Sequence, residues 1–152
     1  MKKLVFVFIA MVLSAAEFAL ADDFGTAAEA RAMLDRAIAG LRADPAGAIV
    51  KFNKADGGFR DRDLYVFCIE AKSGLRVAHV ITESIGKDLR LTTEKDGSPL
   101  GQKIFDAVNS VREGEIGTVS YNWPRPGSTT PVKKESYVTR IGNIGCGVGF
   151  YR

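Results

Sequence analysis

Residues 115–151, about the last quarter of the chain, read EIGTVSYNWPRPGSTTPVKKESYVTRIGNIGCGVGFY and indicate which kind of sheet the chain forms. Runs rich in branched and aromatic residues predict three strands: 115–123, 134–141 and 144–151. Pro124 and Pro126 end the first run, and Gly142–Asn143 turns the chain between the other two. Since strands joined by such short loops run in opposite directions, these residues predict an antiparallel sheet.

The final run alternates glycine with larger side chains. One face of it carries the apolar set Ile144, Cys146, Val148 and Phe150, and the other carries Gly145, Gly147, Gly149 and Tyr151. Glycines at a spacing of two remove side chains from one face of a strand. A helix or a ligand must therefore approach that backbone closely, and a helix is the more common occupant.

Two helices and a hairpin precede this region. Thr26 and Glu29 form a capping box, followed by an apolar helical face that extends to about Arg42. Asp44–Pro45 begins a second, short helix. The next predicted elements are two strands joined by a Ser73–Gly74 turn and a helix, over residues 64–71 (LYVFCIEA), 75–82 (LRVAHVIT) and from Ser98–Pro99 to Gly114. Helices segregated from an antiparallel sheet define an α+β domain.

The first 21 residues have the pattern of a secretory signal peptide. Met1–Lys2–Lys3 is followed by ten apolar residues, 4–13, and then by Ala19–Leu20–Ala21. Retention as a membrane anchor is the weaker alternative, because a span needs about 20 apolar residues and Glu17 interrupts the run. We expect cleavage after Ala21, leaving residues 22–152 as one periplasmic or secreted domain with no membrane span.

Composition and the absence of known motifs argue against several classes of function. The chain has 152 residues, 46% apolar and 26% charged, as in ordinary single folded domains. A net charge of +3 from 21 basic and 18 acidic residues is too small and too mixed for a nucleic-acid binder. With one histidine and no phosphate-loop, serine-hydrolase or zinc-hydrolase motif, we expect neither an enzyme nor a bound metal or cofactor.

The two cysteines, Cys68 and Cys146, both lie in predicted strands. In an oxidising compartment an even pair favours a disulfide. The alternative is a pair of buried thiols that act as small apolar side chains.

Several polar and aromatic residues on the predicted strands are candidates for a binding site, and each also has an ordinary structural interpretation. They are His79, Tyr121, Trp123, Lys134, Tyr137 and Arg140. The histidine is either a hydrogen-bonded core residue or a donor to an anion. Tyr121 and Trp123 share a strand face and form either core or an apolar pocket wall. Lys134 and Arg140 share a face, with Tyr137 on the other, and such cations either face solvent or pair with a carboxylate ligand.

A series of motifs spread along the chain resembles one family. The motifs are DLYVF from Asp63, VAHV from Val77, GKDL from Gly86, DGSPLG from Asp96, VSYNWPRPG from Val119, SYVTR from Ser136 and CGVGFY from Cys146. In this order, over residues 26–152, they are similar to the single Cache domain family, type 2. Val80 departs from the pattern, since the family often has proline after the histidine.

The resemblance implies a PAS-like fold, in which a long N-terminal helix packs along a five-stranded antiparallel sheet. The implied strand order is second, first, fifth, fourth, third, which would bring Cys68 and Cys146 together. It also offers the N-terminal helix as the element that uses the glycine face of the last strand.

The resemblance also implies a function and a site. Cache domains of the single type are extracytoplasmic sensors, often of short carboxylates such as acetate, propionate or pyruvate. The matching positions place His79, Tyr121, Trp123, Lys134 and Tyr137 near the ligand pocket, and Arg140 is a further candidate for ligand binding. The expected partner is a membrane sensor kinase or chemoreceptor, and nucleic acid is not expected. The alternative is an interaction protein that docks on a receptor ectodomain without a ligand.

Overall fold

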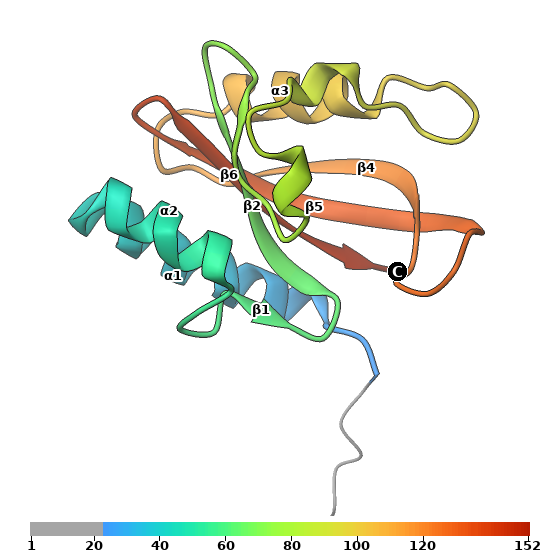
Figure 1. Ribbon diagram of the computed structural model, residues 1–152, viewed down its shortest axis with the longest axis horizontal. Coiled ribbons are helices and arrows are strands. Elements are labelled where there is room, and N and C mark those ends of the chain that lie inside the picture. Colours follow the sequence, from blue (N-terminus) through green and yellow to red (C-terminus); the bar gives the residue numbers. More distant parts are fainter. Residues whose placement is uncertain (1–22) are drawn as a thin grey trace, which may run out of the picture.

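The computed structural model describes residues 23–152. The predicted signal peptide, residues 1–21, lies outside this described part, so its cleavage remains a prediction. The described chain forms an antiparallel sheet with helices on both faces (Figure 1). This arrangement confirms the predicted α+β class.

The first two helices begin at the residues that their local sequence predicts. For α1 (Ala27–Ala43), the Thr26 hydroxyl accepts a hydrogen bond from the Glu29 backbone N–H at 3.2 Å, and the Glu29 carboxylate accepts one from the Thr26 N–H at 2.8 Å. Asp44 caps α2 (Pro45–Lys54) with its carboxylate. These side chains satisfy backbone donors that the first turn of a helix leaves unpaired.

The sheet contains six strands: β1 (Arg60–Asp61), β2 (Leu64–Glu70), β3 (Arg76–Ala78), β4 (Gly117–Pro124), β5 (Pro131–Ile141) and β6 (Ile144–Tyr151). Their order is β1-β2-β6-β5-β4, and β3 also pairs with β2. All pairs are antiparallel. Apart from the two-residue β1, which is too short to show a pattern, this is the predicted order.

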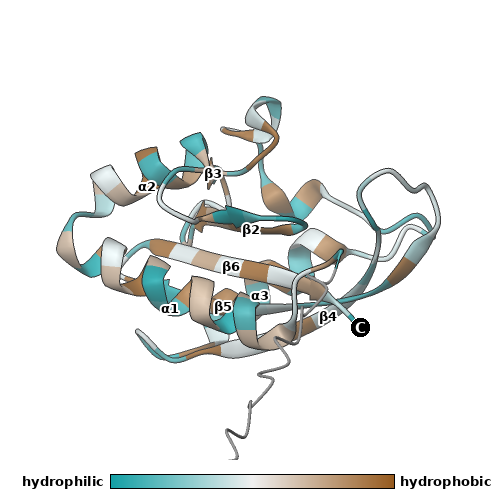
Figure 2. Ribbon diagram, turned by 90° about the horizontal axis from the view of Figure 1, so that it is seen from below, coloured by the Kyte–Doolittle hydropathy of each residue, from teal (hydrophilic) through white to brown (hydrophobic). Residues whose placement is uncertain are grey.

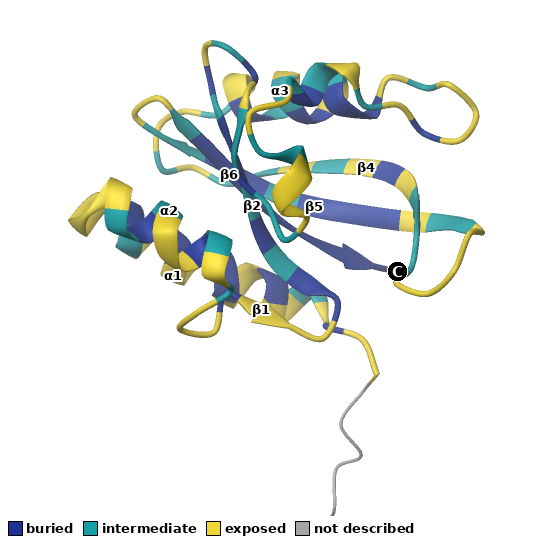
Figure 3. Cartoon of the chain, viewed as in Figure 1, coloured by how far each residue is buried: buried dark blue, intermediate teal, exposed yellow. Residues whose placement is uncertain are grey.

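The helices divide the core into two clusters. On one face, α1 and α2 pack against β2 and β6 (Figure 1). On the other face, α3 (Leu100–Ser110) packs against β4 and β5, and it ends before the predicted limit at Gly114. The strands β2, β5 and β6 are mostly buried or half-buried between the two helical layers, whereas the connecting loops are largely exposed (Figure 3). In α1, hydrophobic and hydrophilic residues alternate with the helical period, as expected of a helix with one buried side (Figure 2).

The structure confirms the disulfide between Cys68 and Cys146. The two residues lie directly opposite each other on the paired strands β2 and β6. Both are fully buried on the face covered by α1. Because β2 and β6 are neighbours in the sheet, a bridge can form between residues 78 positions apart in the sequence.

The glycine face of β6 does not receive the N-terminal helix, so that prediction was wrong. The helix α1 packs on the opposite face, against Cys146, Val148 and Phe150. A Cβ added at Gly145 would lie 2.2 Å from a Val108 side-chain atom of α3. Larger side chains on the α1 side fill the space beneath that helix, which leaves the bare backbone to the other layer.

The second hairpin strand is shorter than the predicted run 75–82. It ends at Ala78, because Asn53 of α2 holds the next backbone groups: its amide donates to the Val77 carbonyl at 2.9 Å and accepts from the His79 N–H at 3.1 Å. Two short 3-10 helices follow, η1 (Thr82–Ser84) and η2 (Leu89–Leu91). The segment after β3 therefore crosses the edge of the sheet towards α3 (Figure 1).

Candidate ligand-binding site

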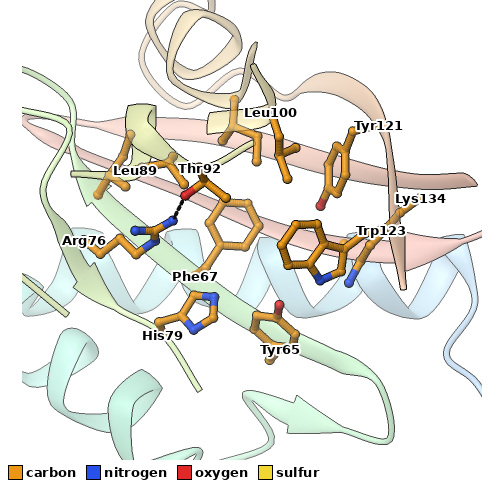
Figure 4. A pocket seen from close by; sticks show the side chains of 13 residues that line it. Tyr65, Phe67, Arg76, His79, Leu89, Thr92, Leu100, Tyr121, Trp123 and Lys134 are labelled. Carbon is orange, nitrogen blue, oxygen red and sulfur yellow. Dashed lines mark hydrogen bonds between the residues drawn. The ribbon is translucent and has the colours of Figure 1, made fainter. Parts of the chain in front are cut away.

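A cavity of about 70 Å³ lies on the α3 side of the sheet. Its walls come from the strands β2 to β6, from the segment between β3 and α3, and from α3 itself. The lining residues are Tyr65, Phe67, Ile69, Arg76, His79, Leu89, Thr92, Leu100, Ile104, Tyr121, Trp123, Lys134 and Gly149 (Figure 4). Apolar and aromatic side chains form most of this lining. Sites for drug-sized molecules occupy about 300–1,000 Å³, so this cavity suits a ligand much smaller than a drug.

Lys134 is the most deeply buried charge in the cavity wall. Its side chain is 3% exposed, and its ammonium lies 4.5 Å from the centre of the Tyr151 ring and 5.3 Å from that of Tyr65. Its hydrogen-bond partner is the Tyr151 hydroxyl at 3.5 Å, which is a long contact. Within residues 23–152, no carboxylate forms an ion pair with it.

Burial lowers the pKa of Lys134 to about 8, although the charge of Asp63 acts in the opposite direction. The physical cause is the loss of water around the ammonium, which disfavours the charged form. At neutral pH the side chain is still mostly protonated. The site therefore holds a cation whose lost hydration is replaced by aromatic faces, one weak hydrogen bond and the more distant charge of Asp63.

The residues around Lys134 are held in place by other contacts. The Tyr151 hydroxyl donates to the Pro124 carbonyl at 2.5 Å, so it can only accept from the ammonium. The Tyr121 hydroxyl and the Ser136 hydroxyl share a buried hydrogen bond of 2.7 Å. A Cβ added at Gly149 would lie 2.5 Å from Lys134 Cε, so glycine is needed for the lysine stem to cross β6.

His79 presents a neutral ring to the cavity. Its Nδ1 accepts a hydrogen bond from the Ile81 N–H at 3.0 Å, which leaves the proton of the neutral ring on Nε2. Burial, together with the charges of Arg76 and Lys134, lowers the pKa of His79 to about 4. The ring meets the Tyr65 ring edge-on at 5.3 Å between centres. At neutral pH, His79 therefore acts as a hydrogen-bond donor and carries no charge.

The structure brings four of the six candidate residues to the cavity, namely His79, Tyr121, Trp123 and Lys134. It does not bring Tyr137 there, because this residue alternates with Lys134 along β5 and packs on the α1 side, 5.1 Å from the Phe150 ring.

Arg140 also lies away from the cavity. It shares the sheet face of Lys134, but at about 3.3 Å per residue it is about 20 Å further along β5. There it donates to the Gly142 carbonyl at 3.1 Å.

Sequence reasoning missed Tyr65, Phe67, Arg76, Thr92 and Gly149 as lining residues. A signal existed for two of them: Tyr65 and Phe67 alternate with the disulfide-bearing face of β2 and so must face away from α1. The glycine pattern marked Gly149 as a close approach without indicating what approaches. No sequence signal pointed to Thr92, which a connecting segment brings to the cavity.

No group of acidic, cysteine or histidine residues within the described range could hold a metal ion. Of the helices in the same range, none is long and apolar enough to cross a membrane.

The fold and the cavity define a class of protein. An antiparallel sheet with β6 between β2 and β5, a helical layer on each face and a small cavity on one side is the architecture of PAS-like sensor domains. The family model described as the Cache domain matches residues 55–151, and the chain belongs to this family of sensor modules. The described residues form one such domain, which confirms the resemblance drawn from the motifs.

Solved structures with the same fold come from chemotaxis proteins. A methyl-accepting chemotaxis protein from Vibrio parahaemolyticus RIMD 2210633 has a TM-score of 0.63 at 17% identity, over 82% of this chain and 86% of that one. The periplasmic sensor domain of a chemotaxis protein has a TM-score of 0.58 at 24% identity, over 80% and 87%.

A third structure is a Cache chemosensory domain described for its recognition of carboxylic acids. It has a TM-score of 0.57 at 23% identity, over 80% of this chain and 85% of that one. At these identities the three likenesses establish the fold alone. A comparison with curated protein sequences gave no match.

Proposed function

We propose that this domain binds a short organic carboxylate at Lys134, outside the cytoplasmic membrane, and passes the signal to a membrane sensor kinase or chemoreceptor. The observation that carries the proposal is a buried ammonium, 3% exposed, with no carboxylate partner among the described residues. A buried charge without a partner is costly, and a bound anion would supply the missing partner.

The rest of the cavity suits the remainder of such a ligand. The indole of Trp123 lies beside Lys134 and the Tyr65 hydroxyl points towards it, so both can donate to a carboxylate oxygen (Figure 4). Phe67, Leu100 and Ile104 offer an apolar surface to a short carbon chain. The likeness to a Cache domain described for carboxylic acid recognition supports the same ligand class.

The extracytoplasmic location and the partner rest on other observations. The sequence begins with the pattern of a signal peptide. A disulfide between two buried cysteines fits an oxidising compartment. Solved structures with a similar fold include a methyl-accepting chemotaxis protein and the periplasmic sensor domain of a chemotaxis protein, which is why a membrane receptor is the proposed partner.

Calorimetric titration with acetate, propionate and pyruvate tests the proposal. We expect saturable heat with one site per chain for at least one of these acids, and none for acetamide or propionamide, which lack the charge. The same acids should raise the melting temperature by mass action. If no short carboxylic acid, these three or a longer one, produced heat or a thermal shift, the proposal would be refuted.

Binding should take up a proton near pH 8. The pKa of Lys134 is about 8 in the ligand-free protein, and a carboxylate beside the ammonium would raise it. Affinity should therefore fall as the pH rises through 8. Calorimetry at pH 8 in two buffers of different ionisation enthalpy measures the uptake, which a Lys134→Met variant should abolish.

The other titratable groups around the cavity should not contribute to the proton uptake measured at pH 8. Burial raises the pKa values of Tyr65, Tyr121 and Tyr151 above their ordinary value of 10.0, and His79, with a pKa of about 4, is already neutral.

The lowered pKa of Lys134 also determines how the stability of the ligand-free protein changes with pH. Because the folded pKa of Lys134 lies below its ordinary 10.5, the unfolded chain binds more protons between pH 8 and 10.5, and Lys134 makes the ligand-free protein more stable as the pH rises there. Binding that was independent of pH from 7 to 9 would contradict this assignment.

A further inference from the structure

A second cation faces the cavity. Arg76 of β3 lies at one side beside Thr92, and Lys134 lies at the opposite side beside Trp123 (Figure 4). The ring of Phe67 and the imidazole of His79 lie between them (Figure 4). Both cations lower the pKa of His79, so both are within electrostatic reach of the middle of the cavity.

Neither cation forms an ion pair with a carboxylate in the described part of the chain. The carboxylate whose charge acts most on Arg76 is that of Asp88, but Arg90 binds its oxygens at 2.6 Å. The carboxylate whose charge acts on Lys134 is that of Asp63: its Oδ1 accepts the Gly25 N–H at 2.6 Å, and its Oδ2 is buried without a hydrogen-bond partner. No aspartate or glutamate is among the lining residues, so the cavity wall carries two positive charges and no negative one.

Arg76 also has unused donors. A guanidinium carries five N–H groups, and the Arg76 side chain donates to the Thr92 hydroxyl oxygen. That hydroxyl retains its own proton, and the Nε2–H of His79 has no hydrogen-bond partner within residues 23–152. Donors on three residues, Arg76, Thr92 and His79, therefore remain available to a second anionic group. A planar guanidinium is well suited to binding both oxygens of a carboxylate.

We propose that the ligand is a short dicarboxylate, with one carboxylate at Lys134 and the other at Arg76. This inference rests on the proposed function, and it departs from the simple monocarboxylates that the family resemblance implies. The methylene groups between the two carboxylates would lie over Phe67 and Leu89. Two anionic groups would match the two unpaired cations, whereas acetate or propionate would leave Arg76 without an anionic partner.

Competition between matched acids tests the proposal. We expect malonate, succinate or glutarate to bind at least about 10-fold more tightly than propionate, and succinate to lose this advantage when one carboxylate is replaced by an amide. The series of three chain lengths also reports the spacing between the two cations.

The Arg76→Gln variant separates the two ends of the site. Its amide can still donate to Thr92, so we expect little change in the melting temperature. It should weaken succinate binding by about 10- to 100-fold and affect propionate far less. The matched control is Arg31→Gln, since Arg31 is exposed on α1, on the other side of the sheet from the cavity, and the substitution should leave both affinities unchanged.

Two results would overturn the proposal in different ways. If propionate bound as tightly as every dicarboxylate, or if Arg76→Gln weakened both classes equally, the dicarboxylate would be wrong while carboxylate binding at Lys134 would stand. If no acid of either class bound, both this inference and the proposed function would fail.

Discussion

Replacing Lys134 with methionine should abolish carboxylate binding and, at the same time, stabilise the ligand-free protein. The variant removes the one cation that is 3% exposed and keeps a side chain of similar length. Removing one partner of a buried charge pair costs about 2–5 kcal/mol, so affinity should fall by about 30-fold or more. In the absence of ligand, replacing a buried charge with an apolar group should add about 1–2 kcal/mol of stability. Calorimetry and thermal unfolding on the same samples measure the two effects.

Lys133→Met is the control for this experiment. Lys133 precedes Lys134 on β5 but is exposed, because successive residues of a strand point to opposite faces. The substitution should change neither affinity nor melting temperature appreciably. A Lys134→Met protein that still bound the acid, or that was less stable than the original by more than the control, would show that Lys134 has a structural role instead.

Removing the disulfide between Cys68 and Cys146 should strongly destabilise the folded protein. The bridge joins residues 78 positions apart, and restricting so long a loop in the unfolded chain adds about 4 kcal/mol in the chain-entropy model. The Cys68→Ala/Cys146→Ala variant should therefore lose about 4 kcal/mol of its free energy of unfolding, measured with urea under oxidising conditions. Its binding site should survive in the folded fraction, because both cysteines lie on the face opposite the cavity.

The two single variants provide the control. Each of them loses the same bridge, so each should be nearly as unstable as the double variant, and the effects should not add. Because both cysteines are fully buried, the native protein should resist reductants until it unfolds. Additive losses, or two reactive thiols in native protein isolated from an oxidising compartment, would contradict the bridge.

Much of the fold was predictable from local patterns. Thr26 with Glu29 and Asp44 with Pro45 determine where the first two helices begin, since capping depends on residues within one turn. The glycine turn at Gly142 and the alternation of residues 144–151 predicted the last hairpin. These features are short-range, and a sequence displays them directly.

Other features depended on which element packs on which face. The alternation of glycines in β6 shows that one face is bare, but only the assembled structure shows that α3 and the cavity, rather than α1, lie on it. The end of β3 was mispredicted for a similar reason, because Asn53 from another element binds the backbone there.

The candidate site, too, was predictable from the sequence only in part. Sequence by itself determined the residue types, Lys134, Tyr121, Trp123 and His79, and the strand faces that they share. Only the tertiary structure decided that Tyr137 and Arg140 lie elsewhere. It also decided that Arg76 of a short edge strand faces the cavity without an ion pair to any carboxylate of residues 23–152. Charge compensation depends on distances between segments remote in sequence, and the periodicity of a single strand carries no information about them.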